Sequence, residues 1–313
     1  MGQGMGNCTM DKCAGGYAVE KCTGGCTVEQ CTGPCNLPCA NICERDMSRM
    51  QAIGPVVAAA PHTAEGKECI TRLISRERRP IHTYENGATY MGQWFGSVRD
   101  GDGVQSWSDG ARYEGQWFND SADGQGRFIH SSGDMYEGAW QNDKAHGHGV
   151  FLHVDGSRYE GQWKDDKQDG EGREEWPDGS LYQGQYKNGA KNGKGQFCWQ
   201  DGATYQGEFN NNDIHGHGTY IWGDGREYSG QWVKDKMHGK GEFRWKDGRS
   251  YEGNYQEDLK AGMGIFRWPD GRSWEGQWVN GKQHGSGVSL APNGDKRTGQ
   301  WAEGNRVKWD AVD

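Results

Sequence analysis

The pattern of aromatic, glycine and polar positions repeats along most of the chain. From residue 90 onward, a motif of Tyr-x-Gly-x-Trp followed by Gly-x-Gly returns every 23 residues without an insertion, as at Tyr113, Gly115 and Trp117. The spacing of two places these three residues on one face of a β-strand, while Glu114 and Gln116 occupy the other face. The pattern therefore predicts short strands with one aromatic and glycine face and one solvated face.

Turn signals separate the copies of the motif. Two-residue Asp-Gly turns accept positive φ at both central positions and close hairpins whose twist suits the strands. They stand at Asp109-Gly110, Asp155-Gly156, Asp178-Gly179, Asp201-Gly202, Asp224-Gly225, Asp247-Gly248 and Asp270-Gly271. Each copy then adds two strands, or about 10 Å of sheet at roughly 4.8 Å per strand. The predicted fold is all-β: an elongated, single-layer, twisted antiparallel meander of 23-residue β-hairpin repeats, with an irregular cysteine-rich N-terminal arm.

The repeat divides the chain into four predicted parts. Residues 1–43 form the cysteine-rich arm, residues 44–83 a linker with a short helix, and residues 310–313 a tail. Residues 84–309 hold nine full repeats and a partial tenth that serves as a cap. In this tenth copy Lys296 and Arg297 interrupt the aromatic row, which discourages the addition of further strands.

The composition points to an unusual core. The chain holds 53 glycines and only 33% hydrophobic residues, yet it has 15 tryptophans and 13 tyrosines. Glycine weakens a strand unless something covers its backbone, and aromatic rings lying over glycine can exclude water without a second layer. We expect the aromatic face to stay partly open, as a groove for a partner. The predicted groove residues are the second rings of the repeats: Trp117, Trp140, Trp163, Tyr186, Phe209, Trp232, Tyr255 and Trp278.

Charge and hydropathy narrow the functional classes. A net charge of -9 disfavours a nucleic-acid partner, because phosphate binding needs a clustered positive surface. No apolar run approaches the roughly 18 residues of a membrane span, and the N-terminus lacks the apolar region of a secretory signal. The sequence therefore predicts a cytoplasmic protein, in which a disulfide framework is a poor explanation for ten cysteines.

The N-terminal arm carries a predicted lipid anchor. Gly2 is the acceptor for N-myristoylation after removal of Met1, although the motif prefers Ser or Thr where this chain has Gly6. One myristoyl chain binds a bilayer only marginally, so palmitoylation of Cys8 and Cys13 would supply the second signal. Metal binding, or a redox or disulfide role, is the alternative, but the common spacing is Cys-x-x-x-Cys rather than the Cys-x-x-Cys of zinc sites. A basic run would add attraction to anionic lipid; it comprises Arg72, Arg76, Arg78 and Arg79.

Residues that resemble catalytic or metal sites have a simpler interpretation. Histidines recur at one position of the repeat, where other copies hold Asp or Asn, so the position is predicted to hold a polar turn residue that bonds its own backbone. They are His146, His215, His238 and His284. Cys198 is predicted to pack within a strand. No Gly-Lys-Ser/Thr step or nucleophile beside a base is present, so we predict neither an enzyme nor a cofactor or metal site.

These motifs resemble the MORN (membrane occupation and recognition nexus) family over residues 84–309. The resemblance implies an elongated twisted sheet that acts as a scaffold where membranes meet the cytoskeleton. It also implies helices or peptides of partners in the groove, and a homodimer through the terminal repeats. Tyr186, Phe209 and Tyr255 depart from the motif by replacing the second Trp, but they keep the ring.

Three functions follow from these expectations. The leading prediction is a lipid-anchored scaffold on the cytoplasmic face of a membrane, which links that membrane to cytoskeletal or membrane proteins, with anionic phospholipid as a further partner. The second is an axonemal or ciliary structural subunit without a lipid anchor. The third is a regulatory subunit of a lipid kinase or another enzyme, which rests on family analogy alone.

Overall fold

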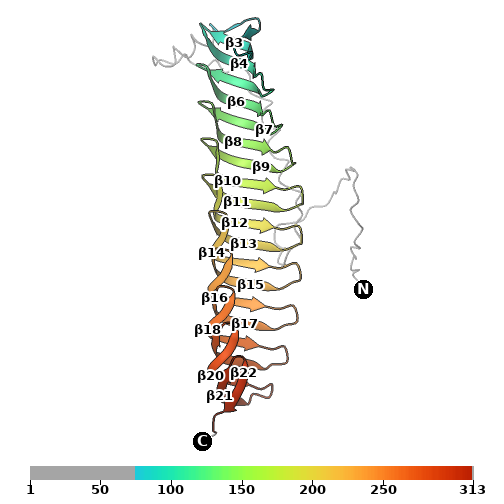
Figure 1. Ribbon diagram of the computed structural model, residues 1–313, viewed down its shortest axis with the longest axis vertical. Coiled ribbons are helices and arrows are strands. Elements are labelled where there is room, and N and C mark those ends of the chain that lie inside the picture. The colour runs from blue at the N-terminus through green and yellow to red at the C-terminus, as the bar shows by residue number, and fades with distance from the viewer. Residues whose placement is uncertain (1–74, 312–313) are drawn as a thin grey trace, which may run out of the picture. The chain divides into compact units, whose positions relative to one another are not determined.

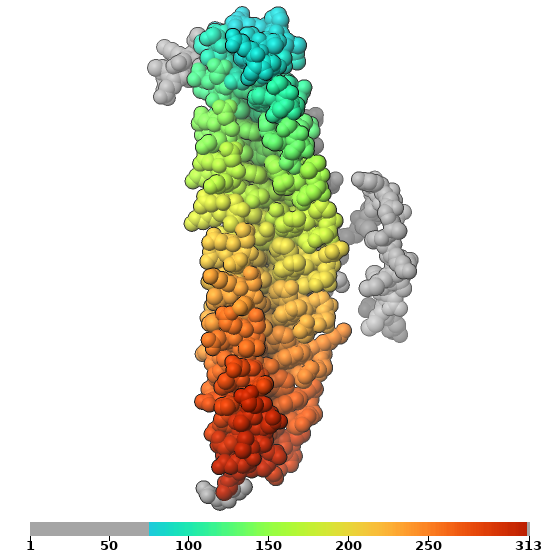
Figure 2. Space-filling model, viewed as in Figure 1, coloured from blue at the N-terminus to red at the C-terminus, as the bar shows by residue number. Residues whose placement is uncertain are grey.

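The computed structural model describes residues 75–311, which form one antiparallel sheet of 22 strands (Figure 1). Every strand from β3 to β22 pairs with the next strand in sequence, which confirms the predicted meander. The described residues contain no helix, which confirms the all-β class. Over these residues, no helix qualifies as a membrane span. Figure 2 shows the repeats as one continuous elongated body.

The strands alternate between seven and nine residues through most of the sheet. They are β1 (Glu77–Arg78), β2 (His82–Thr83), β3 (Thr89–Phe95), β4 (Val98–Ser106), β5 (Arg112–Phe118), β6 (Ser121–Ile129), β7 (Met135–Gln141), β8 (Lys144–Leu152), β9 (Arg158–Lys164), β10 (Lys167–Glu175), β11 (Leu181–Lys187), β12 (Ala190–Cys198), β13 (Thr204–Asn210), β14 (Asp213–Ile221), β15 (Glu227–Val233), β16 (Lys236–Arg244), β17 (Ser250–Gln256), β18 (Leu259–Arg267), β19 (Ser273–Val279), β20 (Lys282–Leu290), β21 (Lys296–Ala302) and β22 (Asn305–Trp309).

The sheet begins earlier than the boundary predicted at residue 84. The short strands β1 and β2 both pair with β3, through Glu77 opposite Trp94 and His82 opposite Tyr90. The last residues of the predicted linker therefore belong to the sheet, where they cover the outer edge of β3. This covered edge offers fewer unpaired backbone groups to another chain.

The connections at the Asp-Gly dipeptides differ from the predicted two-residue turns. Between β4 and β5 the loop spans residues 107–111, and Trp107 bonds both Gly110 and Ala111 through its backbone. Asp109 keeps an ordinary φ, and its carboxylate accepts the backbone N–H of Ala111 at 3.0 Å. Only the glycine has positive φ there, so the prediction of positive φ at both central positions was wrong. The Asp side chain shapes a wider loop instead.

The two-residue turns with positive φ lie within the repeats. Phe118 pairs with Ser121, so the turn consists of Asn119 at φ 50° and Asp120 at φ 69°. Each such turn also bonds the preceding repeat: Asp143 donates its N–H to the Ala122 carbonyl at 3.0 Å and accepts the Ala122 N–H at 2.7 Å. A continuous row of hydrogen bonds therefore joins the turns along the side of the sheet where the strands end.

A row of paired glycines crosses the sheet under the first tyrosine of each repeat. Gly184 pairs with Gly195, and the Tyr182 ring covers both. A Cβ atom on Gly195 would lie 2.5 Å from the Tyr182 hydroxyl oxygen and 2.6 Å from a ring carbon. The hydroxyl donates to the Gln185 carbonyl at 3.0 Å, and Tyr182 is 0% exposed. Rings lying over glycine backbone thus form the core of one layer, as the sequence predicts.

Candidate partner-binding groove

The second rings of the repeats, predicted as the groove, lie mostly within the core. Trp117 is 4% exposed, and its indole N–H donates to the Gly103 carbonyl at 3.2 Å. Only Trp140 and Trp163 are partly buried rather than buried. The six buried rings therefore offer a partner little surface, and the binding role of all eight stays a prediction. The buried second rings are Trp117, Tyr186, Phe209, Trp232, Tyr255 and Trp278.

The rings that reach the surface of the aromatic face lie nearer the loops between the repeats than the second rings do. In the C-terminal half, nine partly or largely buried rings contact one another in sequence, with centroids 4.4–5.5 Å apart. This ring ladder consists of Trp176, Phe197, Trp199, Tyr220, Trp222, Phe243, Trp245, Phe266 and Trp268. Sequence reasoning did not assign these positions to the groove, although their 23-residue spacing is visible in the sequence.

The ladder is interrupted in the N-terminal half, because His130 and His153 stand where later repeats have tryptophan. A second position also differs. The residue opposite the second ring is Ala122 or Ala145 in this half, whereas Ile214 occupies the same position further on. Small side chains and missing rings leave space over these strands.

An open groove fills that space over strands β4 to β9. Its volume is about 580 Å³, and its floor includes Trp117, Trp140 and Trp163. Carboxylates from three successive turns line one side. Each accepts a backbone N–H of the preceding repeat and is thereby held in place; they are Asp120, Asp143 and Asp166. The groove is apolar at its base and acidic at this rim.

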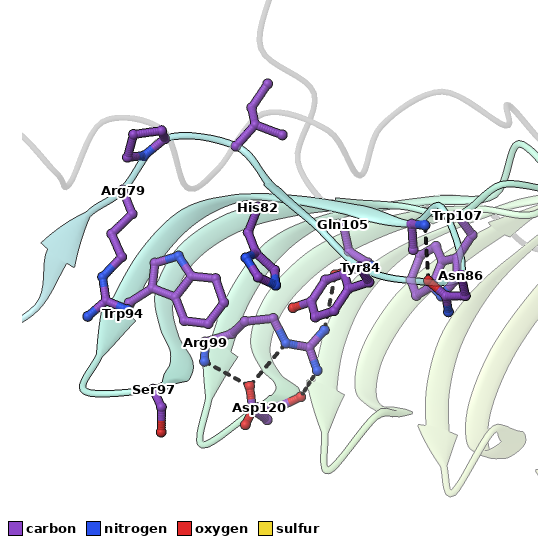
Figure 3. Close-up of a pocket in the computed structure, with 13 residues that line it drawn as sticks. Arg79, His82, Tyr84, Asn86, Trp94, Ser97, Arg99, Gln105, Trp107 and Asp120 are labelled. Atoms are coloured by element: carbon purple, nitrogen blue, oxygen red, sulfur yellow. Dashed lines mark hydrogen bonds and ion pairs between the residues drawn. The ribbon is translucent and has the colours of Figure 1, made fainter.

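A second cavity of about 830 Å³ lies beside β1 and β2 (Figure 3) and shares the lining residues Arg99, Gln105, Trp107 and Asp120 with the groove. Arg99 lies between the two spaces: its guanidinium stands 4.1 Å from the centroid of the Trp117 ring and bonds Asp120 and Gln105. His82 packs edge-on against Trp94 at 5.7 Å. The cation–π contact and the hydrogen bonds hold Arg99 across the groove.

A salt bridge sits at the middle of the aromatic face, where Glu174 replaces the Phe of other repeats. The Lys191 ammonium lies 2.9 Å from Glu174, and the Tyr186 hydroxyl donates to the same carboxylate oxygen at 2.9 Å. The ammonium also lies 4.8 Å from the centroid of the Trp176 ring. Burial and the Glu174 carboxylate raise the pKa of Tyr186 well above its usual range.

For three of the repeated histidines, the predicted bond to their own backbone is absent. The Nδ1 atoms of His146, His238 and His284 are buried without a hydrogen-bond partner. Where the same position holds Asp123, the carboxylate accepts the N–H of Asn142, 19 residues further on, so this position bonds the next turn. Among the described residues, no group of three or more His, Cys, Asp or Glu side chains could hold a metal ion.

The predicted acylation sites Gly2, Cys8 and Cys13 lie outside the described residues, and so does Arg72 of the basic run. Two arginines of the basic run are engaged in the sheet. Arg76 pairs with the buried Asp100 at 2.6 Å, and Arg79 pairs with Glu77. Arg76 thereby connects the start of β1 to the repeats, and Arg79 does so by donating to the Gly96 carbonyl at 2.7 Å, which reduces the charge left for a lipid surface.

Comparison with family models identifies the repeats. The MORN repeat model matches nine consecutive segments: residues 90–112, 113–135, 136–158, 159–181, 182–204, 205–225, 228–248, 251–271 and 274–296. The chain therefore belongs to the MORN-repeat family. MORN repeats are typical of scaffolds for membrane or protein interactions and are associated with membrane-linked proteins, and the family is generally non-enzymatic.

No curated protein matches the chain. Among solved structures, a mutant of the TCP10 domain of Danio rerio CPAP is 10% identical, with a TM-score of 0.26, and covers 75% of this chain and 100% of that chain. The TCP domain of SAS-4 (dCPAP) of Drosophila melanogaster, in complex with a proline-rich motif of Ana2 (dSTIL), is 12% identical, with a TM-score of 0.24, covering 72% and 98%. A virginiamycin B lyase from Staphylococcus aureus with quinupristin is 14% identical, with a TM-score of 0.14, covering 72% and 71%. Such low TM-scores establish no shared fold.

Proposed function

We propose that this protein is a membrane-associated scaffold, not an enzyme, which holds a helix or extended segment of a cytoskeletal or membrane protein in its aromatic groove. The observation that carries the proposal is the open groove of about 580 Å³ over β4 to β9. A concave apolar surface on a rigid repeat frame is a common site for partner segments. The scaffolding role of the family supports the same conclusion.

The chemistry of the groove describes the segment that it would accept. The indoles of Trp140 and Trp163 and the ring of Phe151 offer flat apolar surface for aliphatic or aromatic side chains. The rim carboxylates, such as Asp143 and Asp166, favour a segment that also carries Lys or Arg. An amphipathic segment with apolar residues on one side and basic residues beside them meets both conditions.

Filling the groove tests this role directly. In the variant Ala122→Met with Ala145→Met, the added side chains occupy the space over Trp117 and Trp140. The full chain, immobilised and exposed to a detergent extract of membranes and cytoskeleton, should retain specific proteins that the double variant no longer retains. The matched control is Ser229→Met, an exposed position remote from the groove, which should retain the same proteins as the unmodified chain. Equal retention by all three would contradict a groove-bound partner.

The membrane association is tested separately, because it rests on the N-terminal arm. We propose myristoylation of Gly2 and palmitoylation of Cys8 and Cys13, since two lipid signals are needed for stable anchoring. Gly2→Ala and Cys8→Ser should each move the protein from the membrane fraction to the soluble fraction. The intact mass of the N-terminal peptide would report the attached chains. Unchanged membrane partition of both variants, with no added mass, would overturn the anchor.

A further inference from the structure

Two lysines occupy the same position of the repeat, three repeats apart, and each ammonium group lies close to four aromatic rings. Lys191 lies directly opposite Tyr186 in the sheet, and Lys260 lies directly opposite Tyr255. Lys191 contacts the rings of Trp176, Tyr182, Tyr186 and Phe197 at 4.8–5.9 Å. Lys260 contacts Trp245, Tyr251, Phe266 and Trp278 at 5.0–5.5 Å. Each ammonium group therefore lies within a box of aromatic rings. We call the rings around Lys191 the first box and those around Lys260 the second box.

The two boxes differ in one ring, because Lys191 contacts Tyr186 whereas Lys260 contacts Trp278, and they differ in a carboxylate. At the first box, Glu174 accepts hydrogen bonds from both Lys191 and Tyr186. The repeat position of Glu174 corresponds to Phe243 at the second box. Within residues 75–311, no salt bridge to Lys260 is present, and burial together with the like charge of Arg249 lowers the pKa of its ammonium group. The second box thus has the cation without the anion.

A second polar group near Lys260 also differs from its counterpart at the first box. The Tyr255 side chain is 4% exposed, and its hydroxyl is buried without a hydrogen-bond partner. At the first box, the equivalent Tyr186 hydroxyl donates to Glu174 at 2.9 Å. Burial of a donor without an acceptor is unfavourable, and the Tyr255 hydroxyl lacks the acceptor that its counterpart Tyr186 has. One incoming carboxylate could satisfy both Tyr255 and Lys260.

We propose that Lys260 and Tyr255 form an acceptor site for the side-chain carboxylate of an Asp or Glu on a partner protein segment. This inference rests on the proposed function, in which the aromatic face holds such a segment. Lys260 would supply the charge and Tyr255 a hydrogen bond, while the surrounding rings exclude water and strengthen both. Because Phe243 replaces the internal glutamate, the carboxylate has to come from outside this sheet.

The site also gives the bound segment a direction. The rim carboxylates over β4 to β9 favour basic residues, whereas Lys260 on β18 favours an acidic one. A partner segment lying along the aromatic face would therefore place its basic residues toward β4 and its acidic residue toward β18. The salt bridge of Lys191 with Glu174 lies between these regions and is already satisfied internally.

Propionate, which is the side chain of glutamate without its backbone, tests the site in the full chain. With the lysine Cε atoms labelled with carbon-13, NMR should show the Lys260 resonance moving and saturating as propionate is added. The resonances of Lys191, which already has a carboxylate, and of the exposed Lys240 should move little. Propionamide at the same concentrations should leave all three in place. A Lys260 response no larger than that of Lys240 would overturn the site.

Two variants separate the site from general effects on folding. Phe243→Glu places an internal carboxylate at the position that Glu174 has in the first box, so it should abolish the response of Lys260 to propionate. Lys260→Met keeps the length of the side chain and removes the charge. Its circular dichroism spectrum should match that of the unmodified chain. If Phe243→Glu left the propionate response of Lys260 unchanged, the assignment would be wrong.

A peptide pair distinguishes a protein partner from a free carboxylate. The probes are a synthetic amphipathic helix of Leu, Lys, Ala and Glu and its counterpart with every Glu replaced by Gln. The unmodified chain should bind the Glu peptide about tenfold more tightly, the difference expected for a charge-assisted hydrogen bond. Lys260→Met should remove the preference. Equal binding of both peptides would overturn the proposed site while leaving groove binding intact, and a propionate response with no peptide binding would contradict the groove instead.

Discussion

The aromatic face is built from the same repeat along its whole length, yet it is open over β4 to β9 and filled over β10 to β19. The open half has Ala122 and Ala145 opposite the second rings, and His130 in the row of outer rings. The filled half has Met237 and Trp222 at the corresponding positions. Different residues at these two positions of the repeat therefore create the groove, while the rest of the repeat stays the same.

The difference separates stability from recognition. The glycine row, the tyrosine rings above it and the bonded turns recur in both halves, so they account for the fold. The variable positions change what the face presents, from an empty groove at one end to the Lys191 salt bridge in the middle and an unsatisfied lysine near β18. A repeat scaffold can thus vary its binding surface without changing its backbone.

Alkaline pH should produce the largest difference between the halves. Burial raises the pKa of the core tyrosines above their ordinary value of 10.0, so their contribution to stability is complete below pH 10 and is lost as the pH rises above it. In that range, each such tyrosine lowers the free energy of unfolding by about 1.4 kcal/mol per pH unit. Because Tyr186 and Tyr255 add buried hydroxyls to the C-terminal half, that half should unfold first.

Hydrogen exchange at a series of pH values above 10 would follow the two halves separately. Strands β11 to β18 should lose protection at a lower pH than β3 to β9. The reverse order, or simultaneous loss, would show that the tyrosines do not set the alkaline limit.

Opening the filled half should carry the next largest cost. The double variant Met237→Ala with Trp222→His copies the open half and should lower the free energy of unfolding by about 3–5 kcal/mol, because it removes buried apolar contacts. Urea denaturation measures the loss, and binding of a hydrophobic dye should rise as a new groove forms. If dye binding stayed constant, the two positions would not explain the open groove.

The glycine row should be equally intolerant of change in either half. Gly195→Ala places a Cβ within 2.6 Å of a Tyr182 ring carbon, so we expect a loss of about 1–3 kcal/mol from displacement of the ring. Ser229→Ala, on an exposed position, is the matched control and should change the free energy of unfolding by less than about 0.5 kcal/mol. Equal values for both variants would mean that the ring has room to move.

The salt bridge between the halves should contribute a similar or smaller amount. Glu174→Gln removes the charge that Lys191 and Tyr186 share, at a site where both charged side chains are mostly buried, so we expect a loss of about 1–2 kcal/mol. The effect should persist at high salt, because buried pairs are weakly screened. A loss that disappears in salt would indicate a solvated pair.

The lateral bonds between turns should give the smallest effect. Asp143→Ala removes the carboxylate that accepts the Ala122 N–H at 2.7 Å, and it should cost about 1 kcal/mol. Some turns of this chain already have glycine at the equivalent position, such as Gly189, which keeps only the backbone bond to Gln168. Because Gly189 has a φ of 86°, where a side chain is strained, Gly189→Asp should not raise the melting temperature, as thermal denaturation can detect.

Periodicity alone predicted the strands, their pairing and the cover that tyrosines give to glycines, because a spacing of two and a period of 23 leave one arrangement that buries every ring. The same reasoning placed positive φ at the Asp-Gly dipeptides, where only the glycine adopts it. It also named Trp117 as groove surface, although that ring is 4% exposed. A strand pattern indicates on which face of the sheet a side chain lies, but not how deeply neighbouring side chains bury it.

The amino-acid sequence by itself determined an all-β chain of MORN repeats, since each repeat carries its own turn, strand and core residues within 23 positions. Tertiary structure decided which parts of the aromatic face are open and which polar groups lie there. The groove beside Ala145 and the rings around Lys260 bring together side chains of adjacent repeats, such as Trp278 from the repeat that follows Lys260. Such contacts depend on the register of the whole sheet, which only packing of one repeat on the next establishes.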